Sequence, residues 1–311
     1  MSTLQKHTLK LVAGIDIGGT RTKCGVINSS DGSLLDMKVF PTEHVSEQRF
    51  FDDIATVLSS FNRSARDIRA AGVSIGSYVF SDGSIDGLSS MVPFLTHGYP
   101  LKTKFEEALG MPVQIDNDAR LIGLAEALYG EGKGFSRVLT ITIGTGIGIG
   151  LCEDGKPYGK ESHIHLAGHI RVREGGEYPW LDSTPCYCNM TGCLESTCSG
   201  TALLAHIHHE ISEELTVEDM FTLARQGNNR ALSLVNWYLK LLARALNQYV
   251  YLYCPDVIVL GGGVAQGLRP YLDSLRSQLV ASVYEGQKTE LRITKLKESS
   301  GVIGAASLVK I

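Results

Sequence analysis

The sequence has no run of 18 apolar residues, so we expect no membrane-spanning helix. Its first residues contain no apolar segment long enough for a secretory signal, which predicts a short tail before the first strand and a cytoplasmic protein. Basic charge is not in excess either, because the net charge is −4 and the pI is about 6.1. A broad nucleic-acid-binding surface is therefore not expected.

Two common nucleotide-binding motifs are also absent. No glycine-rich loop ends in Gly-Lys-Ser or Gly-Lys-Thr, which excludes a P-loop. A dinucleotide site needs G-x-G-x-x-G at the start of a helix, with an acidic residue about 20 positions later. The glycine-rich stretches DIGGTRTK and GTGIGIG are instead followed by strand-like sequence. The sequence therefore argues against a Rossmann dinucleotide site.

What the chain does contain is an alternation of strands and helices long enough for two domains. It has 311 residues, 43% of them hydrophobic and 20% charged, as in an ordinary globular protein. Residues 9–18 and 136–152 each begin a block of apolar strand, Gly/Thr turn and second strand. Helices are expected near 46–62, 101–109, 119–130 and 229–253, and from about 268. The pattern predicts duplicated α/β halves with a hinge near 119–135.

Three glycine-rich turns each follow an apolar strand. They are Asp16-Ile17-Gly18-Gly19-Thr20, Gly144-Thr145-Gly146 and Gly261-Gly262-Gly263. Glycines let backbone N–H groups approach a phosphate closely, Thr20 adds a hydroxyl donor, and Asp16 is suited to hold a hydrated Mg²⁺. One such turn alone is weak evidence, since glycine turns between strands are common, but three predict phosphate binding.

Seven cysteines are present, and four of them fall within 13 residues. Without a secretory signal, clustered cysteines more often bind metal than form disulfides. Cys186, Cys188 and Cys193 offer three thiolates, and a structural zinc site needs a fourth ligand. His169 is the candidate, with His163 and His165 as rivals. The other interpretation is that these cysteines are small buried side chains.

The three turns, in this order and spacing, resemble the actin-like ATPase superfamily. Within it, LTITIGTGIGIG together with C-x-C-x4-C-L-E resembles the ROK family of repressors and sugar kinases, from Ala13 to the last helix. The resemblance implies an α/β fold of two actin-like (ribonuclease H-like) domains around a cleft. We expect these at 1–118 and 119–311, with the last helix, about 300–311, as a candidate to pack back onto the first. It also implies ATP, Mg²⁺ and Zn²⁺ as cofactors, a sugar as the substrate and a homodimer.

The same resemblance assigns roles to single residues. Asp118 becomes the catalytic base, although the dipeptide Asn117-Asp118 alone favours a helix cap. Glu195, by itself an ordinary acid at a helix start, becomes sugar-binding. The sugar-binding residues so implied are Asn117, Glu195, His169 and Ser77, and the zinc ligands are His169, Cys186, Cys188 and Cys193. The nucleotide-binding residues are Asp16, Gly18, Gly19, Thr20, Lys23, Gly144, Thr145, Gly146, Gly262 and Gly263.

The chain departs from the family pattern at four places. Gly76-Ser77 stands where the family often has Pro-Gly, and Phe94 where it often has Asn. Leu166 stands where a glutamate usually contacts the sugar, unless the local alignment slips and brings Glu161 or His165 there. Asn189 replaces a glycine of the cysteine loop, and Asn tolerates a left-handed backbone. We therefore expect altered sugar specificity rather than a dead enzyme.

Three functions compete on this evidence. The first is an ATP-dependent kinase for a hexose or N-acetylhexosamine, acting at the 6-hydroxyl. The second is a catalytically weak sugar sensor, suggested by Leu166 and Phe94. A ROK-type repressor is disfavoured, because only 15 residues precede Asp16 and the charge is negative. Local sequence resembles N-acetylglucosamine kinases around Gly168-His169 and allose kinase after Cys193, so no single sugar is indicated.

Overall fold

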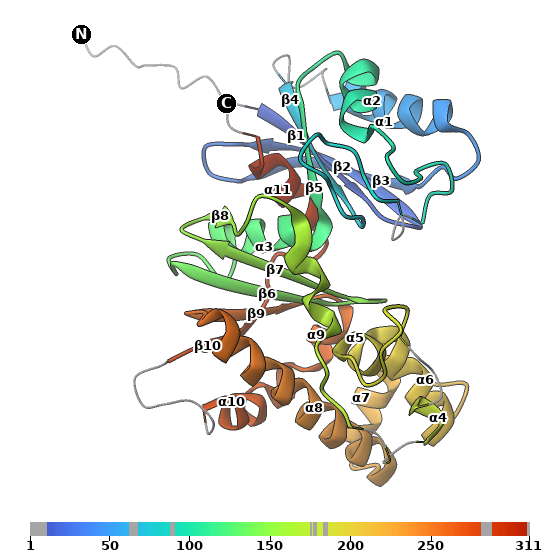
Figure 1. The fold of residues 1–311 in the computed structure, drawn as a ribbon, viewed down its shortest axis with the longest axis vertical. Coiled ribbons are helices and arrows are strands. Elements are labelled where there is room, and N and C mark those ends of the chain that lie inside the picture. Colours follow the sequence, from blue (N-terminus) through green and yellow to red (C-terminus); the bar gives the residue numbers. More distant parts are fainter. Residues whose placement is uncertain are drawn as a thin grey trace. The chain divides into compact units, whose positions relative to one another are not determined.

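The computed structural model describes residues 11–61, 68–87, 91–174, 176, 179–182, 186–280 and 288–309. The chain divides into two compact units (Figure 1). The first contains the described residues up to Gly130, Lys156–His163 and those from Glu298 onward, and the second contains Glu131–Gly155 and Ile164–Lys297. The tail predicted before the first strand lies outside the described residues.

The first unit is built on a mixed sheet in the order β3-β2-β1-β4-β5. β1 pairs antiparallel with β2, and β2 with β3, whereas β4 and β5 continue the sheet in parallel. β1 is an almost continuous apolar run, LVAGIDI, and nearly all of it is buried, as in a strand that is covered on both faces. The strands are β1 (Leu11–Ile17), β2 (Arg21–Asn28), β3 (Leu34–Pro41), β4 (Ile68–Ile75) and β5 (Val113–Asn117).

Helices cover this sheet and close its core. The apolar residues of α1 recur every three or four positions, and the rings of Phe51 and Phe105 meet edge to face with centroids 5.0 Å apart. The helices of this unit are α1 (Glu47–Phe61), α2 (Leu101–Leu109), α3 (Asp118–Tyr129) and α11 (Ser300–Ser307), with η3 (Lys297–Ser299) just before α11.

The last helix, α11, packs directly on β1, β4 and α3. A Cβ added at Gly14 would lie 2.1 Å from the Val302 carbonyl oxygen, and one at Gly72 would lie 1.7 Å from that of Ala305. Only glycine permits so close an approach of helix to strand. The small residues of α11 and these two glycines therefore place the end of the chain on the first sheet.

The second unit repeats the strand order of the first. Its sheet is β10-β9-β6-β7-β8, with an antiparallel β6–β7 hairpin and with β9 and β10 added in parallel; the two-residue edge strand β8 belongs to the segment 156–163 that is grouped with the first unit. Counted from β8, this is the order found in the first sheet, as the predicted duplication requires. The strands are β6 (Arg137–Ile143), β7 (Ile147–Glu153), β8 (Lys156–Pro157), β9 (Val257–Gly261) and β10 (Glu290–Ile293).

The long helix α8 forms the centre of the second core. Asn228 caps its first turn by accepting from the Arg230 and Ala231 N–H groups, and one apolar stripe of the helix is buried. The helices are η1 (Ser162–His169), α4 (Pro179–Asp182), α5 (Leu194–Cys198), α6 (Gly200–Glu210), α7 (Val217–Arg225), α8 (Asn229–Tyr253), α9 (Gly263–Gly267), η2 (Arg269–Tyr271) and α10 (Leu272–Val280).

The α/β class with two similar halves is confirmed. The helices predicted at 101–109 and 229–253 have those bounds, whereas the helix predicted from about 268 begins as a 3₁₀ turn and becomes α10 at Leu272. By its contacts, α3 groups with the first unit, as does the segment 156–163. The domain bounds 1–118 and 119–311 remain a prediction.

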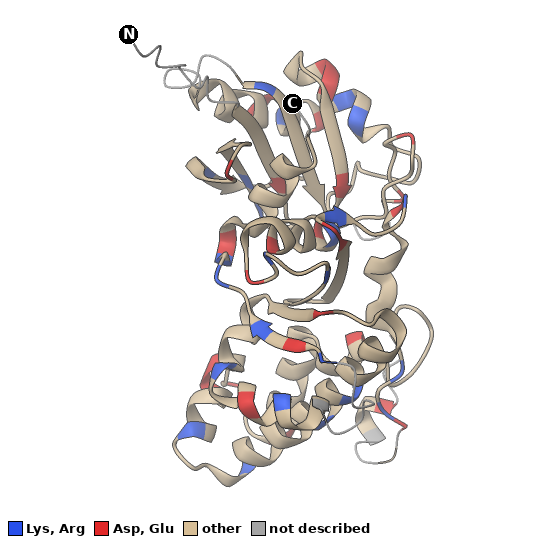
Figure 2. Ribbon diagram, turned by 90° about the vertical axis from the view of Figure 1, so that its left-hand side faces the viewer, with Lys and Arg blue, Asp and Glu red and all other residues tan. Residues whose placement is uncertain are grey.

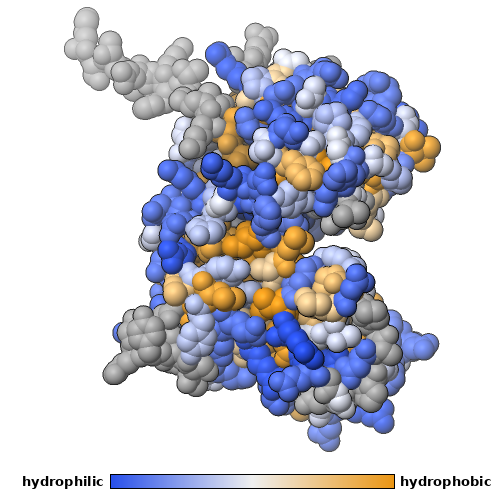
Figure 3. Space-filling model, viewed as in Figure 1, coloured by the Kyte–Doolittle hydropathy of each residue, from blue (hydrophilic) through white to orange (hydrophobic). Residues whose placement is uncertain are grey.

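Charge and hydropathy are distributed as in an ordinary globular protein. Figure 2 shows basic and acidic residues interspersed along both units, and most of the face seen in Figure 3 is hydrophilic. Along the part of the chain that the structure describes, no helix is both long and apolar enough to cross a membrane.

Candidate functional site

Asp16 lies at the end of β1, where three elements of the first unit meet. Ser74 on β4 donates to its Oδ1 at 2.9 Å, and Lys23 Nζ on β2 lies 3.5 Å from its Oδ2. Gly301, near the start of α11, is so close that a Cβ there would lie 2.5 Å from Oδ2. The strand register fixes these neighbours, because Asp16 pairs with both Lys23 and Ser74.

The turn after Asp16 is held by the chain that follows β3. Thr42 donates its hydroxyl to the Gly18 carbonyl at 2.7 Å, and the Gly18 N–H donates to the Arg21 carbonyl at 3.1 Å. Thr42 also donates its backbone N–H to Thr20. This turn is thus a rigid glycine loop next to a carboxylate, the arrangement predicted for a phosphate and its Mg²⁺.

The structure separates the two roles that the dipeptide Asn117-Asp118 left open. Asn117 is the N-cap of α3, because its Oδ1 accepts from the Ala119 and Arg120 N–H groups. Asp118 is the first helical residue and is partly exposed. Its Oδ2 would lie 3.5 Å from a Cβ built on Gly76. The N-cap is therefore Asn117, and Asp118, whose Oδ1 accepts from the Ala119 N–H at 2.8 Å, places its carboxylate in the first turn of the helix.

The other residues predicted around the sugar in the first unit have clear structural surroundings. The buried Ser77 hydroxyl donates to Asp86 at 2.6 Å and accepts from the Gly87 N–H at 3.1 Å. Its carbonyl accepts from Asn117 Nδ2 at 3.1 Å, which ties the loop to the cap. Phe94 packs edge to face on Phe50, with centroids 5.5 Å apart. That contact gives Phe94 a packing role in the core of the unit.

Two of the glycine turns meet around one cavity in the second unit. This cavity has a volume of about 700 Å³, and α6, α7 and α9 border it. Of the residues predicted to bind nucleotide, Gly144, Thr145 and Gly263 line it. The others lining it are Gly200, Thr201, Leu204, Thr216, Val217, Glu218, Phe221, Arg225, Val264, Gln266 and Gly267. The size and mixed polarity suit a small ligand such as a nucleoside phosphate.

Sequence reasoning missed the α6 and α7 side of this cavity. The Gly200 N–H donates to the Gly144 carbonyl at 2.7 Å, and a Cβ on Gly200 would lie 2.6 Å from that oxygen. A sequence signal for this contact exists, because Ser199-Gly200 combines an N-cap serine with a glycine at the start of a helix, where backbone can approach closely. Phe221 and Arg225 on α7 carry no local motif that would have revealed them. Gly262 adopts φ +86° at the end of β9, which explains the glycine there.

Glu195 lies against the second glycine turn. Its Oε2 accepts from the Ile147 N–H at 2.6 Å, and a Cβ on Gly146 would lie 2.6 Å from its Oε1. Burial raises the pKa of Glu195, while the Ile147 N–H acts in the opposite direction by stabilising the carboxylate. Glu195 is thus a half-buried, oriented acid on the short helix that begins just after Cys193.

The four predicted metal ligands gather in one place. The ligand atoms of His169, Cys186, Cys188 and Cys193 all lie within 4.8 Å of one another, and neither His163 nor His165 belongs to this group. His169 Nδ1 is 3.5 Å from Cys186 Sγ, and the sulfurs of Cys188 and Cys193 are 3.4 Å apart. Thiolates around one tetrahedral zinc lie about 3.8 Å apart. The cluster therefore fits a zinc ion.

Neighbouring residues support this geometry. Tyr187 Oη is 2.8 Å from His169 Nε2, and this contact orients the imidazole ring. The other ring nitrogen of His169, Nδ1, faces the cysteine sulfurs. Asn189 has φ +64°, so the left-handed conformation expected at that position is confirmed. Burial raises the pKa of Cys193 to about 12, so metal binding would release a proton there. Leu166, in the preceding 3₁₀ helix, is 44% exposed.

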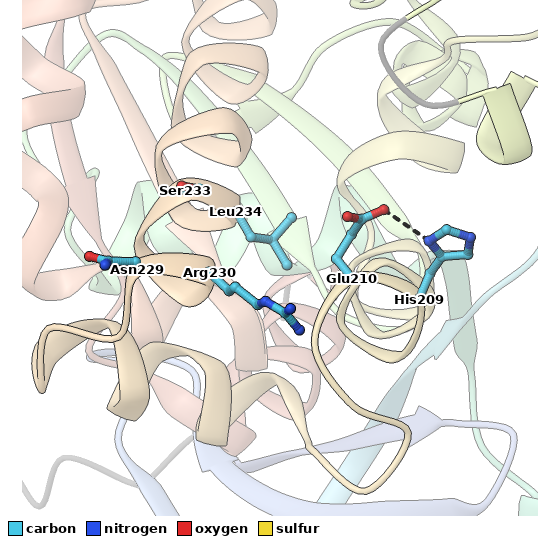
Figure 4. Close-up of a pocket in the computed structure, with 6 residues that line it drawn as sticks. All are labelled: His209, Glu210, Asn229, Arg230, Ser233 and Leu234. Atoms are coloured by element: carbon cyan, nitrogen blue, oxygen red, sulfur yellow. Dashed lines mark hydrogen bonds and ion pairs between the residues drawn. The ribbon is translucent and has the colours of Figure 1, made fainter.

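A second cavity of about 550 Å³ opens beside α6 and the start of α8 (Figure 4). Its lining includes His209 and Glu210, joined by a 2.9 Å hydrogen bond, and Arg230. None of the residues predicted to bind sugar, nucleotide or metal lines it. Beside it, Trp180 stacks on His209, with centroids 4.7 Å apart, and also contacts the buried His206.

Acid should destabilise the second unit through His206. Burial lowers its pKa from 6.5 to about 4, so the unfolded chain takes up the proton first as the pH falls. The contribution of neutral His206 to the free energy of unfolding is fully present above pH 6.5. It should decrease by at most about 3 kcal/mol as the pH falls toward 4. Urea unfolding of His206→Phe should show a shallower pH dependence than the wild type. The exposed His97→Gln should retain the wild-type slope, and parallel curves for all three proteins would contradict this assignment.

Comparison with known proteins agrees with this set of features. The model of the ROK family matches residues 12–311. The glucokinase of Halalkalibacterium halodurans is 30% identical, over 96% of this chain and 94% of its own. The N-acetyl-D-glucosamine kinase of Salmonella paratyphi B is 30% identical, over 81% of this chain and 84% of its own. A ROK family glucokinase from Streptomyces griseus, solved with glucose and AMPPNP, is 26% identical with a TM-score of 0.76, covering 96% of this chain and 99% of its own.

Proposed function

Because the chain belongs to the ROK family, we propose that it is a sugar kinase that transfers the γ-phosphoryl group of ATP to the 6-hydroxyl of a hexose or N-acetylhexosamine. The observation that carries the chemistry is Asp118, a partly exposed carboxylate whose capping role is taken by Asn117. Relatives named for glucose and for N-acetylglucosamine support the substrate class. The primary hydroxyl is the least hindered acceptor.

In this proposal, Asp118 accepts the proton of the attacking sugar hydroxyl. Phosphoryl transfer otherwise needs positioning and charge neutralisation. The backbone N–H groups of Gly19 and Thr20 hold phosphate oxygens, with Lys23 as a nearby cation, since the Gly18 N–H is already bonded to the Arg21 carbonyl. Asp16 would hold hydrated Mg²⁺, which neutralises phosphate charge when bound. The second-unit cavity lined by Phe221 and Arg225 takes the nucleoside.

The zinc ion has a structural role in this proposal. His169, Cys186, Cys188 and Cys193 would hold it as a closed four-ligand site, which leaves no open position for chemistry. Cys193 is the N-cap of α5, and Glu195 is the second residue of that helix. Fixing Cys193 therefore fixes the backbone that carries Glu195. In this way the metal would support a sugar-binding residue without taking part in the reaction.

The experiment is ATP turnover on a panel of hexoses and N-acetylhexosamines. We expect phosphorylation of at least one sugar, and phosphorus–carbon coupling in the NMR spectrum of the product should place the phosphate on C6. Product carrying phosphate at another carbon would contradict the 6-hydroxyl. Binding of a sugar without turnover would instead favour the sensor function that Leu166 suggests.

A further inference from the structure

A buried arginine anchors the segment 158–161 to the helix that begins at Asp118. Arg120 is 4% exposed, and its Nε donates to Asp116 Oδ2 at 2.9 Å. Its Nη1 donates to the carbonyls of Tyr158 and Glu161 at 2.6 and 2.8 Å, and its Nη2 donates to that of Gly159 at 3.2 Å. A paired guanidinium with this many acceptors is rigid. The backbone of Glu161 is thereby fixed relative to α3.

The side chain of Glu161 is held separately from its backbone. Tyr78 donates its hydroxyl to Glu161 Oε2, and the ring of His163 lies edge to face with the Tyr78 ring, with centroids 5.0 Å apart. Burial raises the pKa of Tyr78 to about 12, and the hydrogen bond to Glu161 contributes to the same shift. The phenol therefore stays protonated and donates at neutral pH. Next along the chain, the buried Ser162 accepts from the Val79 N–H at 3.1 Å.

This arrangement leaves one oxygen of the carboxylate available. The side chain of Glu161 is 31% exposed, and within the described part of the chain Oε1 has no hydrogen-bond partner. A surface glutamate is usually mobile, since an exposed ion pair stabilises it little. Glu161 is instead oriented by a tyrosine and anchored by a buried arginine. Such orientation of a single acceptor oxygen is characteristic of a ligand-binding group.

A series of contacts connects Glu161 to the neighbourhood of Asp118. Tyr78 comes two residues after Gly76, the residue whose added Cβ would contact the Asp118 carboxylate at 3.5 Å. Two residues span at most about 7 Å of extended chain. Between them, Ser77 is bonded to the cap Asn117 through its carbonyl. Tyr78, which orients Glu161, and Asn117, which precedes Asp118, are therefore linked through Ser77 within the first unit.

We propose that Glu161 is a specificity-determining sugar-binding residue, whose Oε1 accepts a hydrogen bond from a hydroxyl other than the one phosphorylated. Tyr78 and Arg120 are its positioning residues. The inference rests on the proposed sugar kinase function and adds to it a contact made by the first unit alone. It also supplies a sugar-facing carboxylate in a chain that has leucine at position 166, where the resemblance places a sugar-contacting glutamate.

The test is calorimetric titration of sugar binding without ATP, using the sugars of the panel and their monodeoxy analogues. Glu161→Ala should weaken binding of the preferred sugar by about tenfold to a hundredfold, because a hydrogen bond to a charged acceptor is lost. The deoxy analogue that lacks the recognised hydroxyl should bind the wild type and Glu161→Ala equally. The fold should persist, because Arg120 holds the carbonyl of residue 161 and not its side chain.

Two further variants separate orientation from general damage. Tyr78→Phe should weaken binding less than Glu161→Ala does, and should have no additional effect when combined with it, since it acts through Glu161. Glu107→Ala, an exposed glutamate of the same unit paired with Lys104, should bind like the wild type. A loss of affinity that is equal for every deoxy analogue would overturn the inference.

Turnover measured on the same proteins keeps the inference separate from the proposed function. If the wild type phosphorylates a sugar and Glu161→Ala binds it unchanged, the inference fails and the kinase function stands. If the wild type binds a sugar without phosphorylating it, and Glu161→Ala loses that binding, the inference stands and the kinase function fails. Binding of no sugar to the wild type overturns the inference as well.

Discussion

Asp118→Asn is expected to lower sugar phosphorylation by about 10²- to 10⁴-fold, the range of general base catalysis. Asparagine keeps the size of the side chain and an Oδ1 that can still accept from the Ala119 N–H, at present 2.8 Å away. The helix cap is unaffected, because it is formed by Asn117. The change therefore removes a proton acceptor and little else. Steady-state kinetics should show the loss in kcat, with sugar affinity and melting temperature near those of the wild type.

A matched control is available in the same unit. Asp52→Asn changes an exposed aspartate of α1 in the same chemical way and should leave kcat unchanged. If Asp118→Asn turned over sugar at close to the wild-type rate, the base would have to be another group. A parallel fall in melting temperature would instead assign Asp118 a structural role at the start of α3.

Cys186→Ser should lose the zinc ion. Elemental analysis of the wild type should give about one zinc per chain, as expected for one closed site, and the variant should give far less. Apparent binding energies for structural zinc are about 10–16 kcal/mol in small zinc domains, so loss of one ligand should loosen the whole loop. Because Glu195 follows Cys193 by two residues, sugar affinity should fall together with the metal content.

The control for this experiment is another cysteine of the second unit. Cys254 is exposed, lies at the end of α8 and is outside the four-residue cluster. Cys254→Ser should therefore keep the zinc content and the sugar affinity of the wild type. Wild-type protein that is folded and contains no zinc would rule out the metal site, and a chelator that removes zinc without affecting sugar binding would rule out its link to Glu195.

Local patterns predicted most of the elements, because each depends on neighbouring residues. The strand and glycine-turn blocks at β1–β2 and β6–β7, and the apolar stripe of α8, arise from periodicity and turn chemistry within a few residues. The left-handed backbone at Asn189 was predictable for the same reason. The spacing of the three cysteines likewise predicted that their thiols come together, and the family resemblance added His169.

By itself, the sequence determined the α/β class, the glycine turns and the three clustered cysteines, all of which depend on local residue chemistry, whereas the structure selected His169 over His163 and His165. Only the tertiary structure decided that Asn117 rather than Asp118 caps α3, because the two residues have equal capping propensity and differ only in backbone position. It alone brought Phe221 and Arg225 to the cavity of the glycine turns. It also joined Arg120 to the carbonyls of Tyr158 and Glu161, because contacts between residues 38 and 41 positions apart leave no periodic trace in the sequence.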